Sequence, residues 1–202
     1  SQIACVSVPA RPCVIGSVDL PGNALDIVLV GDKAFVACGK AGLQVVEVRN
    51  PSQPRLIASL ALPKVCWSVA VAGDRAFAAC GKGGLIVVDI SDPSRPQVTA
   101  RCDRPGNIIK IVLDGDLGYL SDYAGGIEVL DLGDPDRPRH LTTVATPGPT
   151  ISATLWRTRL LVPLFGEGLA IFDLSDRQHP TLKTVLRGPR PWRQGTVADS
   201  VI

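Results

Sequence analysis

A spacing of 42 residues runs through the whole chain without an insertion or a deletion. Four glycines follow one another at this interval: Gly42, Gly84, Gly126 and Gly168. Prolines keep the same interval in two further series, which begin at Pro12 and at Pro21. A fixed period of about 40 to 45 residues is typical of propellers and solenoids, in which each repeat buries its apolar face against its neighbours. The spacing therefore predicts an array of similar units.

Each unit contains four short apolar runs. In the unit that starts at Trp67, these runs cover residues 68–72, 76–80, 85–90 and 97–102. They are rich in Val, Ile and Ala, and turns rich in Gly, Asp and Pro separate them, as expected for strands rather than helices. No window shows a sustained helical period, which disfavours a helical solenoid. Four antiparallel strands in a meander predict an all-β fold built from the blades of a β-propeller.

The phase of the repeat predicts how the array closes. Ser1 is equivalent to Leu43, and Ile202 is equivalent to Ala34. Five units would need 210 positions, eight more than the 202 residues present. We therefore expect residues 1–202 to form a single domain of five blades, either complete or part of a longer protein. Its closing blade is shared by the two termini, with strands at 195–200, 3–8 and 13–19. Such closure removes free sheet edges.

Four segments carry a resemblance to a known repeat: GLQVVEVRNPSQP, GLIVVDISDPSRP, GIEVLDLGDPDRP and GLAIFDLSDRQHP. They resemble the bacterial LVIVD-type propeller repeat over nearly the whole chain. The resemblance implies the propeller fold and a location that is extracellular, at the cell surface or periplasmic, but no reaction. Near the end of the second strand the family often has Asp. This chain has Cys38, Cys80, Asp122 and Leu164 there, so no shared ligand role is implied.

Charge and motifs exclude several classes of function. The net charge is +2, from 21 basic and 19 acidic residues, which is too balanced to indicate nucleic-acid binding. No run of about 18 apolar residues is present, so we expect no direct membrane insertion. The sequence lacks GxSxG, HExxH and P-loop motifs. We therefore predict a protein that is not an enzyme and binds no metal or cofactor.

Binding residues are expected where loops meet at the mouth of the central channel. The loops between blades contain residues 23–26, 65–68, 107–110, 150–152 and 191–194, and hairpins at 39–41, 81–83, 122–125 and 165–167 face them. The residues that open the first strands differ from blade to blade: Asp26, Ser68, Lys110, Ser152 and Gln194. They form either an asymmetric polar binding site or only the wet lining of a channel.

Aromatic residues gather at the same mouth. Trp67 and Trp192 lie in loops between blades, and Tyr123 and Phe165 lie in the facing hairpins. They either make a stacking platform for a sugar or a partner side chain, or fill gaps between blades. With the polar positions, they complete the candidate binding set: Asp26, Trp67, Ser68, Lys110, Asp122, Tyr123, Phe165, Trp192 and Gln194.

The cysteines divide into two groups. Cys5 and Cys13 lie symmetrically about a turn, so a disulfide between them is predicted in an oxidising compartment. Cys38, Cys66 and Cys80 are either a metal or redox cluster or, as we favour, buried thiols that pack as small apolar groups.

Other polar residues fit structural roles. His140 and His179 are expected to be solvated turn residues. Glu47, Asp89, Asp131 and Asp173 recur in phase at the end of the third strand, which predicts that they accept backbone N–H bonds in the following turn.

Two functions remain open. The first is a non-catalytic interaction or scaffold module of a surface or secreted assembly, which binds a protein or a glycan through the loops of one propeller face. The alternative is a propeller hydrolase or lyase that uses Asp26, Lys110 and Asp122 at the mouth of the channel.

Overall fold

The computed structural model of the chain describes residues 2–5, 13–103 and 106–187. Within these residues all regular structure is β-strand, and no helix is present that is long and apolar enough to cross a membrane. The first sheet contains β3 (Asp26–Val30), β4 (Lys33–Ala37), β5 (Leu43–Glu47) and β6 (Arg55–Leu60). The second contains β7 (Ser68–Ala72), β8 (Arg75–Ala79), β9 (Leu85–Asp89) and β10 (Gln97–Cys102).

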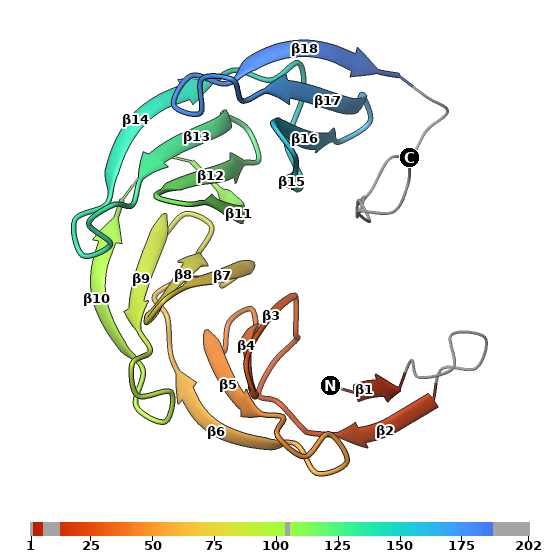
Figure 1. Cartoon of the computed structure of the whole chain (residues 1–202), viewed down its shortest axis with the longest axis vertical. Coiled ribbons are helices and arrows are strands. Elements are labelled where there is room, and N and C mark those ends of the chain that lie inside the picture. Colours follow the sequence, from red (N-terminus) through yellow and green to blue (C-terminus); the bar gives the residue numbers. More distant parts are fainter. Residues whose placement is uncertain (1, 6–12, 104–105, 188–202) are drawn as a thin grey trace.

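Two further sheets repeat this plan. The third contains β11 (Ile108–Asp114), β12 (Leu117–Asp122), β13 (Gly126–Asp131) and β14 (Arg139–Val144). The fourth contains β15 (Thr154–Trp156), β16 (Arg159–Leu164), β17 (Gly168–Asp173) and β18 (Thr181–Leu186). All four sheets are antiparallel meanders in chain order. Figure 1 shows them side by side in an arc, with the first strand of each toward the centre and the last on the outer rim. The predicted four-stranded unit is confirmed, and the strands of the second sheet begin and end within one residue of their predicted limits.

A two-stranded sheet of β1 (Gln2–Cys5) and β2 (Cys13–Ser17) precedes the first sheet. Its register shifts between Ile3 and Ala4, and the pairing of β5 with β6 shifts 42 residues later, between Val45 and Val46. The same shift recurs at the equivalent place in the other three sheets. β1 and β2 therefore correspond to the third and fourth strands of a unit, as the phase predicted. The strand expected at 195–200 lies outside the described residues.

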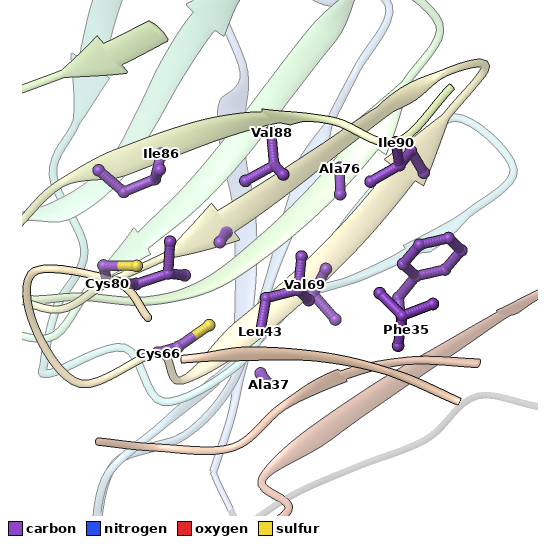
Figure 2. Packing of buried hydrophobic residues seen from close by; sticks show 13 residues of the cluster. Phe35, Ala37, Leu43, Cys66, Val69, Ala76, Cys80, Ile86, Val88 and Ile90 are labelled. Atoms are coloured by element: carbon purple, nitrogen blue, oxygen red, sulfur yellow. The ribbon is translucent and has the colours of Figure 1, made fainter. Parts of the chain in front are cut away.

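The core lies between neighbouring sheets. Phe35, Ala37 and Leu43 of the first sheet share one buried cluster with Val69 and Val88 of the second, which Figure 2 shows from close by. Equivalent clusters join the second sheet to the third and the third to the fourth. Each sheet thus covers the apolar face of the next, which is how repeats without a core of their own become stable.

The repeated glycines have a common structural cause. Gly42 and Gly84 have φ angles of 79° and 70°, in the left-handed region that disfavours residues with a Cβ. A Cβ added at Gly42 would also lie 2.2 Å from the carbonyl oxygen of Leu60, at the end of the fourth strand. Gly126 and Gly168 show the same close approach to the fourth strands of their sheets. Glycine therefore recurs every 42 residues because the chain at the start of the third strand passes very close to the end of the fourth strand.

The acidic residues that end the third strands have the predicted turn role in three sheets. The carboxylates of Asp89, Asp131 and Asp173 each accept the backbone N–H two residues later, at 2.7–2.9 Å. Glu47 differs, because no backbone N–H among the described residues donates to its carboxylate, which pairs with Lys33 and Arg55.

The prediction for His140 was wrong. This residue lies in β14, and its Nε2 atom is 2.7 Å from a carboxylate oxygen of the buried Glu128. The register shift between β13 and β14 brings His140 opposite Leu130 and leaves its ring within reach of Glu128. His179 lies in an exposed turn, as expected, with Nδ1 2.9 Å from Asp176.

Candidate functional site

Polar residues from three sheets meet at the central axis. The Oδ2 atom of Asp26 accepts a hydrogen bond from the Ser68 hydroxyl at 2.5 Å and lies 2.9 Å from the Lys110 ammonium group. The backbone N–H of Val69 donates to the same oxygen at 3.2 Å. These residues stand at equivalent positions in the first strands of successive sheets. The structure therefore brings together three of the predicted site residues, Asp26, Ser68 and Lys110.

Ser68 connects this group to the third sheet. Its side chain is buried, and its hydroxyl oxygen accepts the backbone N–H of Ile111 at 3.4 Å. The side chains of Asp26 and Lys110 keep 21% and 25% of their surface exposed, so the ion pair is only partly removed from solvent. The attraction between two partly solvated charges is weak, so the surrounding hydrogen bonds contribute much of what keeps this ion pair in place.

A cavity of about 430 Å³ opens above this polar group. Its lining residues are Leu25, Asp26, Trp67, Asn107, Ile109, Lys110, Tyr123, Ile151 and Ser152. Nearly all of them come from the segments that open the first strands, and Tyr123 comes from the hairpin between β12 and β13. The cavity has the size and the mixed lining of a small-molecule site.

Two rings of residues make up most of this lining. The polar ring contains Asp26, Lys110 and Ser152, and an apolar ring contains Leu25, Trp67, Ile109 and Ile151. Ser68 has the equivalent polar position in the second sheet, but it is buried and does not line the cavity. Both rings keep the 42-residue interval. Sequence reasoning placed the loops correctly but did not single out Leu25, Ile109 and Ile151. The 42-residue interval was enough to predict these positions, because each stands one residue before a polar position of the candidate site.

Trp67 and Tyr123 line the cavity while remaining 40% and 39% exposed. The backbone N–H of Trp67 donates to the carbonyl of Ala79 at 2.8 Å, which fixes the loop that carries the indole. A Cβ on Gly81 would lie 3.2 Å from the indole nitrogen, so glycine there allows the ring to lie against the hairpin. Both aromatic side chains therefore line the cavity and remain partly exposed, while the Trp67 indole also lies close to the Gly81 hairpin.

Two predicted site residues have other positions. The buried carboxylate of Asp122 accepts the backbone N–H groups of Asn107 and Ala124, at 2.9 and 3.2 Å. It therefore shapes the loop that carries Asn107 and does not line the cavity. Phe165 is 54% exposed on the hairpin of the fourth sheet, outside the lining. Trp192 and Gln194 lie outside the described residues.

The buried thiols pack as apolar groups. Cys38, Cys66 and Cys80 are fully buried within the sheet cores, and Figure 2 shows the last two among the apolar side chains. Hydrogen bonding with Cys80, together with burial, raises the pKa of the Cys66 thiol. Among the described residues, no three His, Cys, Asp or Glu side chains are arranged to hold a metal ion.

Cys5 and Cys13 stand opposite each other in the register of β1 and β2. Cys13 carries an exposed free thiol in the structure. The disulfide between these two residues stays a prediction.

Comparison with known proteins gives one family match. The model of the LVIVD repeat matches residues 21–61, 65–104 and 162–186, together more than half of the chain. No curated protein matches the sequence.

Two solved structures of designed proteins are similar to the chain in fold. The crystal structure of the computationally designed Ika4 protein has a TM-score of 0.63 and 8% identity, over 77% of this chain and 93% of that one. The computationally designed Ika8 protein has the same score and identity, over 83% of this chain and 50% of that one. At 8% identity this likeness concerns the fold alone.

Proposed function

The chain belongs to the LVIVD repeat family, and from this premise we propose that it is a non-catalytic interaction module that binds a protein or a glycan at the axial cavity. One observation carries the proposal. Gly42, Gly84, Gly126 and Gly168 repeat one residue at the 42-residue interval, whereas the polar positions Asp26, Lys110 and Ser152 of the cavity carry different side chains in different sheets. A concave surface that presents several different side chains is suited to binding a ligand.

We also propose that the sheets are blades of a five-bladed propeller closed by a blade shared between the termini. Ile27 and Leu29 of β3 are each 62% exposed, whereas Val69 and Ile111, which are equivalent to Ile27, are 4% and 2% exposed. In the other sheets this face is covered by the second and third strands of the sheet before it. A closing blade next to β3 would bury the exposed pair.

Removal of residues 194–202 tests this closure. The truncated protein should unfold at a lower temperature than the full chain, because the closing blade loses a strand. Unchanged thermal unfolding would contradict a role of the C-terminal segment in closing the ring.

The resemblance to LVIVD-type proteins supports a location outside the cytoplasm, in a surface or secreted assembly. Fractionation of the producing cells, with protease added to intact cells, tests this location. Protein that remains in the cytoplasmic fraction and resists the protease would contradict it.

The alternative of a hydrolase or lyase gains no support from the geometry. It requires Asp122 to join Asp26 and Lys110, but the Asp122 carboxylate accepts two backbone N–H groups, from Ala124 of its own hairpin and from Asn107 of the loop before β11. Asp26 and Lys110 neutralise each other at 2.9 Å.

Arrays of proteins and glycans test the interaction function when three proteins are compared. These are the unmodified chain, the double variant Trp67→Ala/Tyr123→Ala and the control Trp156→Ala. Trp156 lies at the hairpin between β15 and β16 and does not line the cavity. We expect at least one ligand that binds the unmodified chain and the control but not the double variant. Binding that all three proteins share would place the interaction surface elsewhere and contradict the proposal.

A further inference from the structure

The lining of the axial cavity indicates what kind of ligand it takes. Building on the interaction function proposed above, we infer that the cavity binds a neutral saccharide unit, such as the terminal hexose or N-acetylhexosamine of a glycan. Size, charge, hydrogen-bonding groups and aromatic surface each support this class of ligand.

The size of the cavity favours a small group over a protein surface. Its volume of about 430 Å³ lies within the range of small-molecule sites. A stable protein interface buries about 800 Å² on each partner. Around the cavity the exposed large apolar side chains are few: Leu25, Trp67 and Tyr123 line it, and Phe165 does not. The concave surface is therefore suited to a single inserted unit.

The charge of the lining favours a neutral ligand. Asp26 and Lys110 are the charged side chains of the lining, and they pair at 2.9 Å, so the formal charges cancel. An anionic ligand drawn to Lys110 would also meet the Asp26 carboxylate, and a cationic ligand would meet the ammonium group. Either ligand would compete with an ion pair that is already formed.

The same pair offers both a donor and an acceptor. Oδ2 of Asp26 already accepts from Ser68, Val69 and Lys110, which holds the carboxylate in one orientation. Among the described residues, no group donates to the other oxygen, Oδ1. Lys110 has further N–H groups beyond the one it shares with Asp26. Hydroxyl groups both donate and accept, so neighbouring hydroxyls of a sugar match this arrangement.

Asn107 and Ser152 add an amide and a hydroxyl to the lining. These groups also donate and accept hydrogen bonds. A ligand with several hydroxyl groups satisfies all of them, whereas a purely apolar side chain would leave them without partners, at a cost in binding.

The aromatic residues supply the remaining surface. Trp67 and Tyr123 lie on loops of different sheets and are both partly exposed at the cavity. Aromatic rings offer a large flat contact at little cost in conformational entropy. The C–H face of a pyranose ring is flat and apolar, while its edge carries hydroxyl groups. One sugar ring therefore has both kinds of surface that the cavity presents.

A binding experiment with defined glycans tests the inference. Neutral oligosaccharides that end in hexoses or N-acetylhexosamines are screened on an array beside sialylated, sulfated and uronic-acid glycans. The tightest ligands are then measured by isothermal titration calorimetry. We expect neutral glycans to bind and their charged counterparts to bind more weakly. Trp67→Ala should reduce the affinity by about tenfold or more, because it removes a central aromatic contact.

Two further variants add a control outside the cavity and a test of the ion pair. Trp156→Ala removes a tryptophan outside the cavity and should bind as the unmodified chain does. Asp26→Asn keeps an oxygen that can accept from Ser68 but removes the charge, and it should lower affinity for neutral glycans. Thermal unfolding of each variant identifies any that fail to fold, and only folded variants are compared.

The outcomes separate this inference from the proposed function. No binding of neutral glycans, tighter binding of charged ones, or an affinity that Trp67→Ala leaves unchanged would each overturn the inference. If glycans do not bind but a purified protein ligand loses binding in Trp67→Ala and not in Trp156→Ala, the saccharide is wrong and the interaction function stands. If neither class of ligand depends on Trp67, both are wrong.

Discussion

The carboxylate of Asp26 and the ammonium group of Lys110 lie 2.9 Å apart, although 84 residues separate them in the sequence. Both residues stand in first strands, and one whole sheet lies between theirs in the chain. The contact is therefore possible only because the sheets are arranged around a common axis. It joins the first sheet directly to the third, past Ser68 of the second.

Replacement of Asp26 by Ala is expected to destabilise the protein by about 2 kcal/mol, because charge-assisted hydrogen bonds are lost and donors are left without an acceptor. The affected donors belong to Ser68, Val69 and Lys110. Denaturation in urea, monitored by fluorescence, measures the loss. Asp103→Ala, at an exposed position after β10, is the matched control and should change stability little. Equal losses for the two variants would show that the axial network contributes nothing to stability.

Replacement of Gly42 by Ala is expected to cost more stability than replacement of Gly73 by Ala. Both glycines have positive φ angles, of 79° and 53°, so both variants carry the backbone penalty of about 1–2 kcal/mol. Only at Gly42 would the new Cβ also meet a backbone oxygen, at 2.2 Å, whereas nothing lies within 4 Å of a Cβ at Gly73. The difference between the two unfolding free energies isolates the close contact with the fourth strand. If the two variants have the same stability, the close contact with the fourth strand does not require glycine at position 42.

Acid is expected to destabilise the fold as Asp173 becomes protonated. Hydrogen bonds from the hydroxyl and backbone N–H of Ser175, with Arg159 and Lys183 nearby, lower the pKa of Asp173 from 3.8 to about 2. Because this folded-state pKa lies below that of the unfolded chain, the stabilisation is complete above about pH 4 and is lost as the pH falls toward 2. Urea midpoints measured between pH 2 and pH 6 should show the decline.

Asp173→Asn should flatten this pH dependence, whereas Asp19→Asn, at an exposed position after β2, should leave it as it is. A profile that is equally steep in the unmodified chain and in Asp173→Asn would assign the acid sensitivity to other carboxylates, such as Asp32, whose pKa is also lowered to about 2.

Oxidation is predicted to link Cys5 to Cys13, which stand opposite each other in β1 and β2. The bridge would hold the N-terminal pair of strands together, so a reductant should lower the melting temperature of the oxidised protein. Cys13→Ser should melt at a temperature that the reductant does not change. Two alkylated thiols at positions 5 and 13, found by mass spectrometry without prior reduction, would contradict the prediction.

The spacing of the sequence predicted the strands because each turn depends on local residues. Gly73 and Asp74 form the hairpin between β7 and β8, and the glycine before β9 has the positive φ that its place requires. Spacing also predicted that Asp26, Ser68 and Lys110 approach one axis. These features follow from residue type and position alone, without knowledge of the packing.

The roles of Asp122, Phe165 and His140 could not be predicted in this way. Asp122 has the spacing of a site residue, but its carboxylate turns to the N–H groups of two neighbouring loops. Phe165 is on a hairpin that faces the mouth, yet its ring lies outside the cavity. The position of His140 depends on a register shift between β13 and β14. Side-chain direction and register arise from contacts between strands, which spacing does not encode.

The recurring register shift between the third and fourth strands has a consequence for how such proteins diversify. Because the register shifts at the same place in each described pair of third and fourth strands, and equivalent clusters join neighbouring sheets, one unit is a suitable replacement for another. Duplication or shuffling of whole units would change the order of Asp26, Ser68 and Lys110 around the axis. The hydrophobic clusters between neighbouring sheets would stay intact. New recognition could then arise by rearranging modules rather than by redesigning a core.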